Sequence, residues 1–411
     1  MIRRATPLLA ALFALLAGCV VNDVRPVAKV DAVQAKTQIA EVELLDVAIH
    51  EFDPGIPAAL ADDVEALDKR RIYPEVRKAE TRLIATRLKS TLETSGQWGA
   101  VRVVPSTVRF VDLLVTGRIV ESTGMRLSLE ITASDAVGRN WINKKIYSGE
   151  ADVGAYKTDA SLRARDPFQN VYAQIANDLL QARERLDATQ RAELRQVARL
   201  RFAADLAPQT FSAYLARGAD GLTHLVRLPA ENDPAVARID KIRDRDAALI
   251  DTIDGYNSGF SEKLFDSYGG FRRTSRDAIE REERVKSQAR TRTILGSAAV
   301  LAAILAKANC APTDYACQRL ESAARTAGAV GGVAAVMSGI KKYSDAKVAA
   351  QEVKELATSF QNEATPQVVE VEGRTLKLTG TAEERYREWR KLLAGIYQEE
   401  NARPADPAVQ P

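Results

Sequence analysis

The chain has 411 residues, a formal net charge of +3, 27 % charged residues and 46 % hydrophobic residues. This composition is ordinary for soluble globular domains, and the length allows two or three of them. The 58 basic residues nearly balance the 55 acidic ones, so the charge gives no reason to expect nucleic acid or an acidic polymer as a partner.

Residues 1–18 have the pattern of a secretion signal. Arg3 and Arg4 precede an apolar run of ten residues, from Leu8 to Ala17. That run is far shorter than the roughly 20 residues of a membrane-spanning helix, and small residues at its end are typical of a processing site. Removal of the signal lowers the formal net charge to about +1.

The signal ends in Leu16-Ala17-Gly18-Cys19, which resembles the lipobox of bacterial lipoproteins. The resemblance implies that Cys19 is acylated and becomes the first residue of the mature protein, with residues 19–37 as a tether. Val20, rather than an aspartate, follows the cysteine, and by the usual sorting pattern of such lipoproteins this implies the outer membrane and its periplasmic face. The alternative is an ordinary signal peptide with a chance cysteine near its cleavage site.

The two other cysteines, Cys310 and Cys317, lie seven positions apart. In an oxidising periplasm such a pair predicts a disulfide that closes a small loop, and the alternative is two free, buried thiols. A structural zinc site needs four ligands, and the only histidines, His50 and His224, are distant in sequence. The sequence therefore predicts no metal site.

An α/β domain is predicted from residue 38 to residue 182. Its first helix should end at Ser95-Gly96, because glycine is a common helix stop, and Asp166 is placed to cap a second helix that begins at Pro167. The apolar stripe of this second helix is Phe168, Val171, Tyr172, Ile175 and Leu179, and Leu127, Leu129 and Ile131 share one face of a strand. The predicted strands are 41–49, 98–106, 111–122, 125–138 and 141–152, and the helices are 73–95 and 167–182.

Three stretches of this domain resemble a known family. They are LKSTLETSGQWGAVRVVPS, DLLVTGRI and LEITASDAVGRNW, which begin at Leu88, Asp112 and Leu129. They are similar to the small α/β domain of the curli-secretion lipoprotein CsgG, of the N-terminal part of TolB and of lipoprotein activators of penicillin-binding proteins. The resemblance implies an α/β sandwich that works by protein–protein contact, with no catalytic residue and no cofactor. The segment after the first strand is longer and more acidic than in these families.

A charged helical domain is predicted over residues 183–290. One helix should end at Pro208, a short strand and loop follow at 221–234, and a long helical stretch begins near Ala235. Aromatic residues recur every three or four positions in that stretch, which favours a helix core packed against a neighbour. The alternative is a platform on which glycans or lipids stack. These aromatics are Tyr256, Phe260, Phe265, Tyr268 and Phe271.

Residues 291–345 contain two apolar, small-residue-rich stretches, 294–306 and 327–340, with the cysteine loop between them. Both are too short to span a membrane, and the stripe of small residues in the second allows close approach of two helices. The sequence predicts an αα-hairpin with three alternatives for its surroundings: the protein core, the membrane surface, or a neighbouring subunit in an oligomeric helical barrel.

Residues 346–400 are predicted to form a helix, a β-hairpin around Glu372-Gly373 and a C-terminal helix capped by Thr381, with Glu384 completing the cap. The apolar stripe of the last helix is Tyr386, Trp389, Leu393 and Ile396. The Pro- and Ala-rich tail 401–411 is expected to be disordered. The fold class is thus α+β: a small α/β sandwich domain, then a mainly helical region with a Gly/Ala-rich hairpin and a C-terminal β-hairpin plus helix.

No catalytic or cofactor-binding residue is predicted. Neither histidine lies in a nucleophile-elbow motif, no phosphate-binding or dinucleotide motif is present, and nothing distinguishes a carboxylate pair such as Glu75 and Asp112. The sequence favours a non-enzymatic, outer-membrane-anchored lipoprotein that faces the periplasm and binds or positions an unidentified envelope protein. The alternative is an oligomeric secretion-channel subunit of the curli type, and a cell-wall-cleaving enzyme is a weaker third hypothesis.

Overall fold

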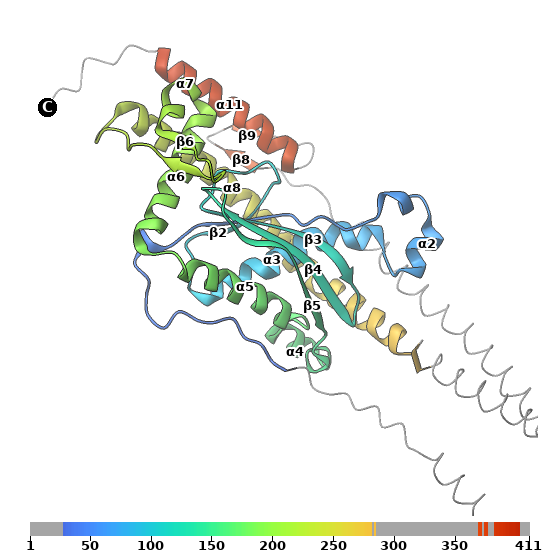
Figure 1. Cartoon of the computed structure of the whole chain (residues 1–411). Helices are drawn as coiled ribbons and strands as arrows, with labels where there is room; N and C mark the ends of the chain where they lie inside the picture. Colours follow the sequence, from blue (N-terminus) through green and yellow to red (C-terminus); the bar gives the residue numbers. More distant parts are fainter. Residues whose placement is uncertain (1–27, 282, 285–368, 372–373, 377–381, 403–411) are drawn as a thin grey trace, which may run out of the picture.

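The computed structural model describes residues 28–281, 283–284, 369–371, 374–376 and 382–402 (Figure 1). Within these ranges a five-stranded mixed sheet is surrounded by helices, which confirms the predicted α+β class. None of the helices in this part of the chain is long and apolar enough to cross a membrane. The predicted hairpin of residues 291–345 lies outside the described residues.

The central sheet has the strand order β2-β1-β3-β4-β5. β1 is parallel to both of its neighbours, and the pairs β3–β4 and β4–β5 are antiparallel. The predicted first strand starts too early, because residues 41–43 form a 3-10 turn and pairing begins only at Val47. The strands are β1 (Val47–His50), β2 (Val101–Val104), β3 (Leu113–Ser122), β4 (Arg126–Asp135) and β5 (Asn140–Glu150).

One face of the sheet packs against two helices, α3 (Pro74–Ser95) and α5 (Gln169–Glu184). Leu127, Leu129 and Ile131 are fully buried on this face, as their alternation predicts. α3 ends as expected, since Gly96 adopts the left-handed conformation with a φ of 65°. The stripe predicted for α5 is also confirmed as buried.

The start of α5 differs from the prediction. The helix begins at Gln169 instead of Pro167, and Phe168 holds the N-cap position. The Asp166 carboxylate accepts a hydrogen bond from the backbone N–H of Phe168 at 2.9 Å, so it forms a tight turn ahead of the helix. A buried ion pair with Arg272 explains why this carboxylate lies outside the cap.

The other face of the sheet is partly covered by α6 (Ala188–Leu206) and α8 (Pro234–Lys263). α5 and α6 are separate helices. α5 ends at Glu184, and Asp187 caps the start of α6 in a capping box. Leu200 and Phe202 of α6 pack in one core with Ala48 of β1. The helices that follow residue 182 therefore share their packing with the sheet.

Shorter elements are η2 (Ala58–Leu60), α2 (Val64–Lys69), η3 (Val153–Tyr156), α4 (Asp159–Ala164), α7 (Pro208–Phe211), η4 (Ser212–Tyr214), β6 (Leu215–Arg217) and β7 (Thr223–Leu225).

After a turn at Leu264, helical conformation resumes over residues 265–281. Phe260, Tyr268 and Phe271 are buried against α3, where they pack with Val76 and Leu83. The prediction of a helix core is confirmed for these three aromatic residues, whereas the other two predicted members, Tyr256 and Phe265, are only half-buried.

The C-terminal elements also match their predicted types. β8 (Val369–Val371) and β9 (Arg374–Leu376) pair in antiparallel register, and α11 (Ala382–Ala402) crosses α8 (Figure 1). The buried stripe of α11 includes Tyr386, Trp389 and Leu393 as predicted, with Tyr397 in addition, while the predicted Ile396 is only half-buried. Thr381, the predicted cap, lies outside the described residues.

Candidate functional site

The three residues predicted to carry modifications, Cys19, Cys310 and Cys317, lie outside the described residues. The first described part of the chain, residues 28–37, is the second half of the predicted tether. We call it the docked segment, because it lies along α5 in extended conformation.

Two asparagines of α5 hold the docked segment. Asn170 accepts a hydrogen bond from the N–H of Val30 at 2.9 Å and donates one to the carbonyl of Ala28 at 3.0 Å. Asn177 does the same seven residues later, with the N–H of Val33 at 2.8 Å and the carbonyl of Asp31 at 3.0 Å. Seven residues are close to two helical turns, so both amides lie on one side of the helix.

Further bonds fix both ends of the docked segment. Arg165 donates to the Val30 carbonyl at 3.0 Å and to the Asp31 carboxylate at 2.8 Å, and this hydrogen bond lowers the pKa of Asp31. The N–H of Ala35 donates to the carbonyl of Ser95 at the end of α3, at 2.8 Å. At least ten residues of the predicted tether are therefore part of the folded body. Two asparagines seven residues apart on one helix are the sequence feature that indicates such a binding site. Their partners lie at least 140 residues away, so the sequence does not show what they bind.

A polar groove of about 550 Å³ lies beside the docked segment, between α3 and α4. Its cations all have carboxylate neighbours: Arg163 bonds Asp266 at 2.9 Å, and Arg87 lies 3.6 Å from Asp166. Hydroxyl groups on α3 complete the wall. The groove can offer N–H and O–H donors to a polar or anionic group, and it contains no nucleophile beside a base. The lining includes Lys29, Arg87, Ser90, Thr91, Thr94, Arg163, Arg165 and Gln169.

The helix of residues 265–281 is fixed to the same region by buried charge. Arg272 has only 3 % of its surface exposed, and its guanidinium lies 3.1 Å from the Asp166 carboxylate and stacks 4.2 Å from the Tyr268 ring centroid. The turn between β3 and β4 touches this helix so closely that a Cβ on Gly124 would lie 2.1 Å from the Arg272 carbonyl oxygen. Only glycine fits there.

A second buried carboxylate joins this helix to α3 and the sheet. Glu80 of α3 is 1 % exposed and accepts hydrogen bonds from the hydroxyls of Tyr268 at 2.7 Å and Ser122 at 2.6 Å. Arg77 lies 3.6 Å from its other oxygen. We call this region the α4 end: α4, the β3–β4 turn, residues 28–31 and residues 265–281.

A small cavity of about 100 Å³ lies at the opposite end of the sheet, between the strand starts, α6 and α8. Burial raises the pKa of both Asp112 and Asp246 to about 6. Asp112 accepts the N–H of Asp46 at 3.0 Å, and Asp246 accepts the hydroxyl of Tyr386 at 3.0 Å. These bonds give the carboxyls structural roles, and the cavity has room for about three water molecules.

The two histidines and the pair Glu75 and Asp112 do not come together in one site. The His50 ring hydrogen-bonds the Val108 carbonyl at 2.8 Å, and burial lowers its pKa. His224 pairs with Asp220 in the β6–β7 hairpin. Glu75 begins α3 at the α4 end, whereas Asp112 lies near its other end, so they cannot act as a carboxylate pair. Across the described ranges no three potential metal ligands cluster.

Comparisons with protein families, with curated proteins and with solved structures find no match to this chain. The resemblance to the CsgG, TolB and synthase-activator domains therefore stays a prediction.

Proposed function

We propose that the protein is a lipoprotein anchored in the outer membrane through acylated Cys19, and that its body faces the periplasm and binds or positions another envelope protein without catalysis. The docked segment is the observation that supports this best. An extended stretch with many specific bonds that begins nine residues after the lipobox cysteine is what a short, fixed connection between anchor and body requires.

The distance along the chain makes this connection short. Nine peptide steps separate Cys19 from Ala28, and nine extended residues reach at most about 30 Å. An anchored body would therefore stay close to the membrane surface. Such confinement raises the local concentration for partners in the same membrane layer without any new contact.

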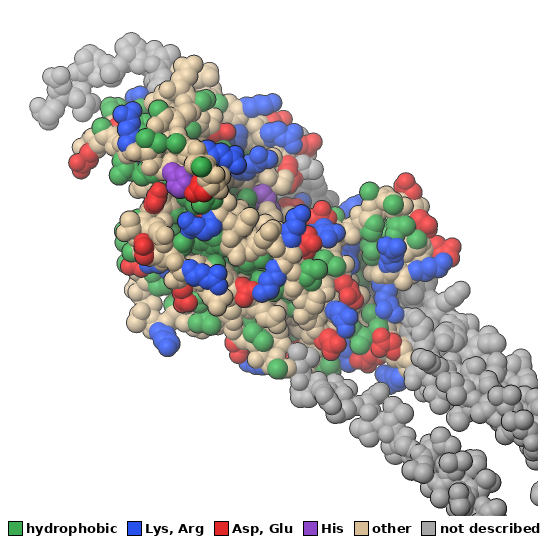
Figure 2. Space-filling model, viewed as in Figure 1, with side chains coloured by type: hydrophobic (Ala, Val, Ile, Leu, Met, Phe, Trp, Pro, Cys, Tyr) green, Lys and Arg blue, Asp and Glu red, His purple; other side chains and the backbone are tan. Residues whose placement is uncertain are grey.

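The body has an exposed surface suited to a protein partner. The sheet face over β3, β4 and β5, opposite to α3 and α5, has no helix over it among the described elements. Val120 is 42 % and Ile146 is 56 % exposed there, and Arg118 pairs with Glu130 between them. On the face in view in Figure 2, basic and acidic side chains are interspersed, without a large area of one sign. Non-obligate protein contacts are about as apolar as the rest of a protein surface, so a face with exposed apolar side chains among paired charges can bind a protein partner.

Anchoring is tested by Cys19→Ser with palmitate labelling and membrane fractionation. We expect the variant to lose the label and to stay as precursor or leave the membrane fraction. Val20→Asp is the matched control: it should keep the label but, by the sorting pattern of lipoproteins, no longer fractionate with the outer membrane. A Cys19→Ser protein that is still labelled and membrane-bound would refute the proposal.

The kind of assembly is tested by the native mass of the acylated protein in mild detergent. The proposal predicts a monomer, or a complex that contains a second polypeptide. A closed homo-oligomer of ring size would instead favour the secretion-channel alternative and would contradict the adaptor role.

A further inference from the structure

We infer that the α4 end is the surface that faces the membrane and lies against phospholipid headgroups. This inference rests on the proposed lipid anchor and adds an orientation to it. Three features of the α4 end support it: the place where the docked segment begins, the place of the helix that precedes the apolar stretches in the sequence, and an exposed apolar side chain nearby.

The chain from Cys19 joins the body at the α4 end. Ala28 and Val30 bond Asn170 in the first turn of α5, and Arg165 at the end of α4 holds Val30 and Asp31. The opposite end of the body is marked by the β4–β5 turn, where the N–H of Thr223 donates to the Val137 carbonyl at 2.8 Å. β4 has 10 residues and separates the two ends by about 34 Å. A tether of about 30 Å therefore favours contact of the α4 end with the bilayer.

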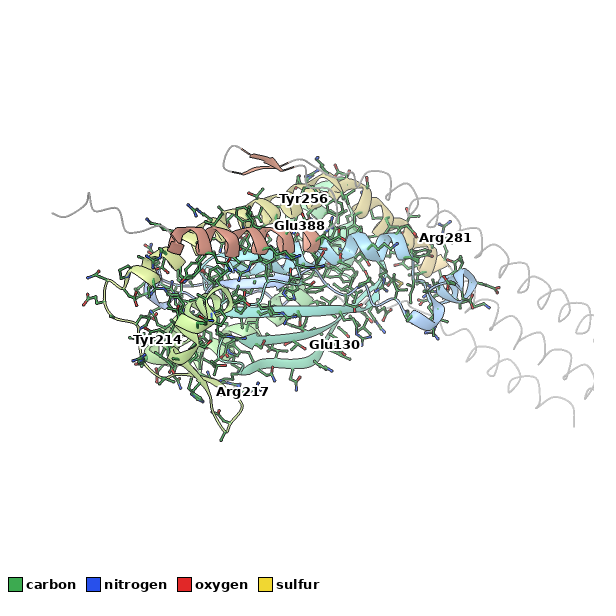
Figure 3. All side chains as sticks on the ribbon, turned by 90° about the horizontal axis from the view of Figure 1, so that it is seen from above. Glu130, Tyr214, Arg217, Tyr256, Arg281 and Glu388 are labelled. Carbon is green, nitrogen blue, oxygen red and sulfur yellow. The ribbon has the colours of Figure 1, made fainter. Side chains whose placement is uncertain are left out.

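The helix of residues 265–281 runs along the same end. It pairs with α4 through Arg163–Asp266 and Arg273–Asp159. Figure 3 shows Arg281 at one end of the molecule and Arg217 far from it, toward the other. The apolar stretches 294–306 and 327–340 follow this helix in the sequence. The described elements that adjoin the predicted anchor and the apolar stretches in the sequence, the docked segment and the helix of residues 265–281, thus meet at one end of the body.

The loop that carries α2 adds an exposed apolar contact there. Tyr73, at the start of α3, packs edge-on against Phe271 with ring centroids 6.1 Å apart, so α2, which ends four residues earlier, lies near this end. Val64 on α2 is 56 % exposed and lies between Asp63 and Glu65, while Lys69 and Arg70 stand at the end of the helix. The exposed valine side chain suits the boundary between headgroups and acyl chains, and the charges around it are of both signs.

The test places a fluorophore on one cysteine at either end of the acylated, full-length protein. Lys157 at the α4 end and Arg217 on β6 are both exposed basic residues, so Lys157→Cys and Arg217→Cys form a matched pair in a background with Cys310→Ser and Cys317→Ser. The protein is reconstituted into vesicles of phosphatidylethanolamine and phosphatidylglycerol that contain headgroup spin-labelled lipid. We expect several-fold stronger quenching at position 157 than at position 217.

Equal quenching at the two positions, or stronger quenching at position 217, would overturn the orientation. Failure of the proposed function looks different, since a protein without acyl chains would not sediment with the vesicles at all. Circular dichroism of both variants checks that the body is folded. A third variant with a Gly-Ser insertion between Cys19 and Ala28 should weaken quenching at position 157, and unchanged quenching there would contradict the role of the short tether.

Discussion

The free energy of unfolding should depend on pH through the carboxyl of Asp112. Its carboxyl lines the cavity between the strand starts and α8, and burial raises its pKa from 3.8 to about 6. Between these values the unfolded chain releases the proton first, so the folded state binds more protons. The free energy of unfolding therefore falls as the pH rises from about 4 to about 6. Each pKa unit corresponds to roughly 1.4 kcal/mol, so the full loss is about 3 kcal/mol.

Asp112→Asn should remove this loss, because the amide oxygen can still accept the N–H of Asp46 while no charge is buried. We expect the variant to be more stable than the wild type at about pH 7, by up to about 3 kcal/mol, with a smaller difference at about pH 5. Urea titrations at both pH values, followed by far-UV circular dichroism, measure this. Asp220→Asn is a control of opposite sign, since hydrogen bonding by His224 lowers the pKa of that exposed carboxyl.

A variant Asp112→Asn that is destabilised by the same amount at both pH values would refute the reasoning. It would mean that the carboxylate is held by its partners in the ionised form, and that the nearby Arg195 and Arg243 outweigh the cost of burial.

Three further predictions concern the α4 end and the docked segment. Gly124→Ala should destabilise the fold by about 1–3 kcal/mol through its clash with the helix backbone, whereas Gly270→Ala, with open space around it, should be neutral or stabilising by up to about 1 kcal/mol; thermal unfolding compares them. Arg272→Met should lower the free energy of unfolding, measured in urea, by about 3 kcal/mol, because it removes the closer of the two arginines beside the buried Asp166 carboxylate; a cost no larger than that of an ordinary surface change would contradict the buried pair. Asn177→Ala should speed deuterium exchange at the Val33 amide, and unchanged exchange there would show that this bond does not hold the segment.

Local patterns predicted most elements of the sheet and its first helix layer. Alternation in β4 and the apolar stripe of α5 depend on neighbours a few residues away, and the structure buries those residues. The burial of α6 does not follow from local patterns. Its charged sequence suggests a solvent-exposed helix, yet Leu200 and Phe202 are buried. Arginines with long aliphatic stems alternate with apolar residues along this helix, so its sequence does not define one apolar side. The position of the sheet decides which side of the helix is buried.

The contacts of the candidate site could not be predicted, because they join residues that are far apart in sequence. Arg272 and Asp166 are 106 residues apart, and Tyr268 and Glu80 are 188 apart. Asp166 has the right position for a helix cap, so local rules assign it to that role. The docked segment was predicted as a tether, since nothing in its own composition shows that two asparagines of α5 bind it.

The buried charges of the α4 end explain how its parts keep a fixed arrangement. A buried ion pair adds little net stability, but one partner without the other costs several kcal/mol. Apolar contacts alone would let the helix of residues 265–281 slide along α3, whereas a shift by one turn would break the Tyr268–Glu80 hydrogen bond and the Arg272–Asp166 ion pair. Because Arg163 and Arg165 flank the end of α4 and hold this helix and the docked segment, respectively, the docked segment and the helix of residues 265–281 have a fixed spacing on the body. The membrane-facing orientation that we propose for the α4 end requires such a spacing.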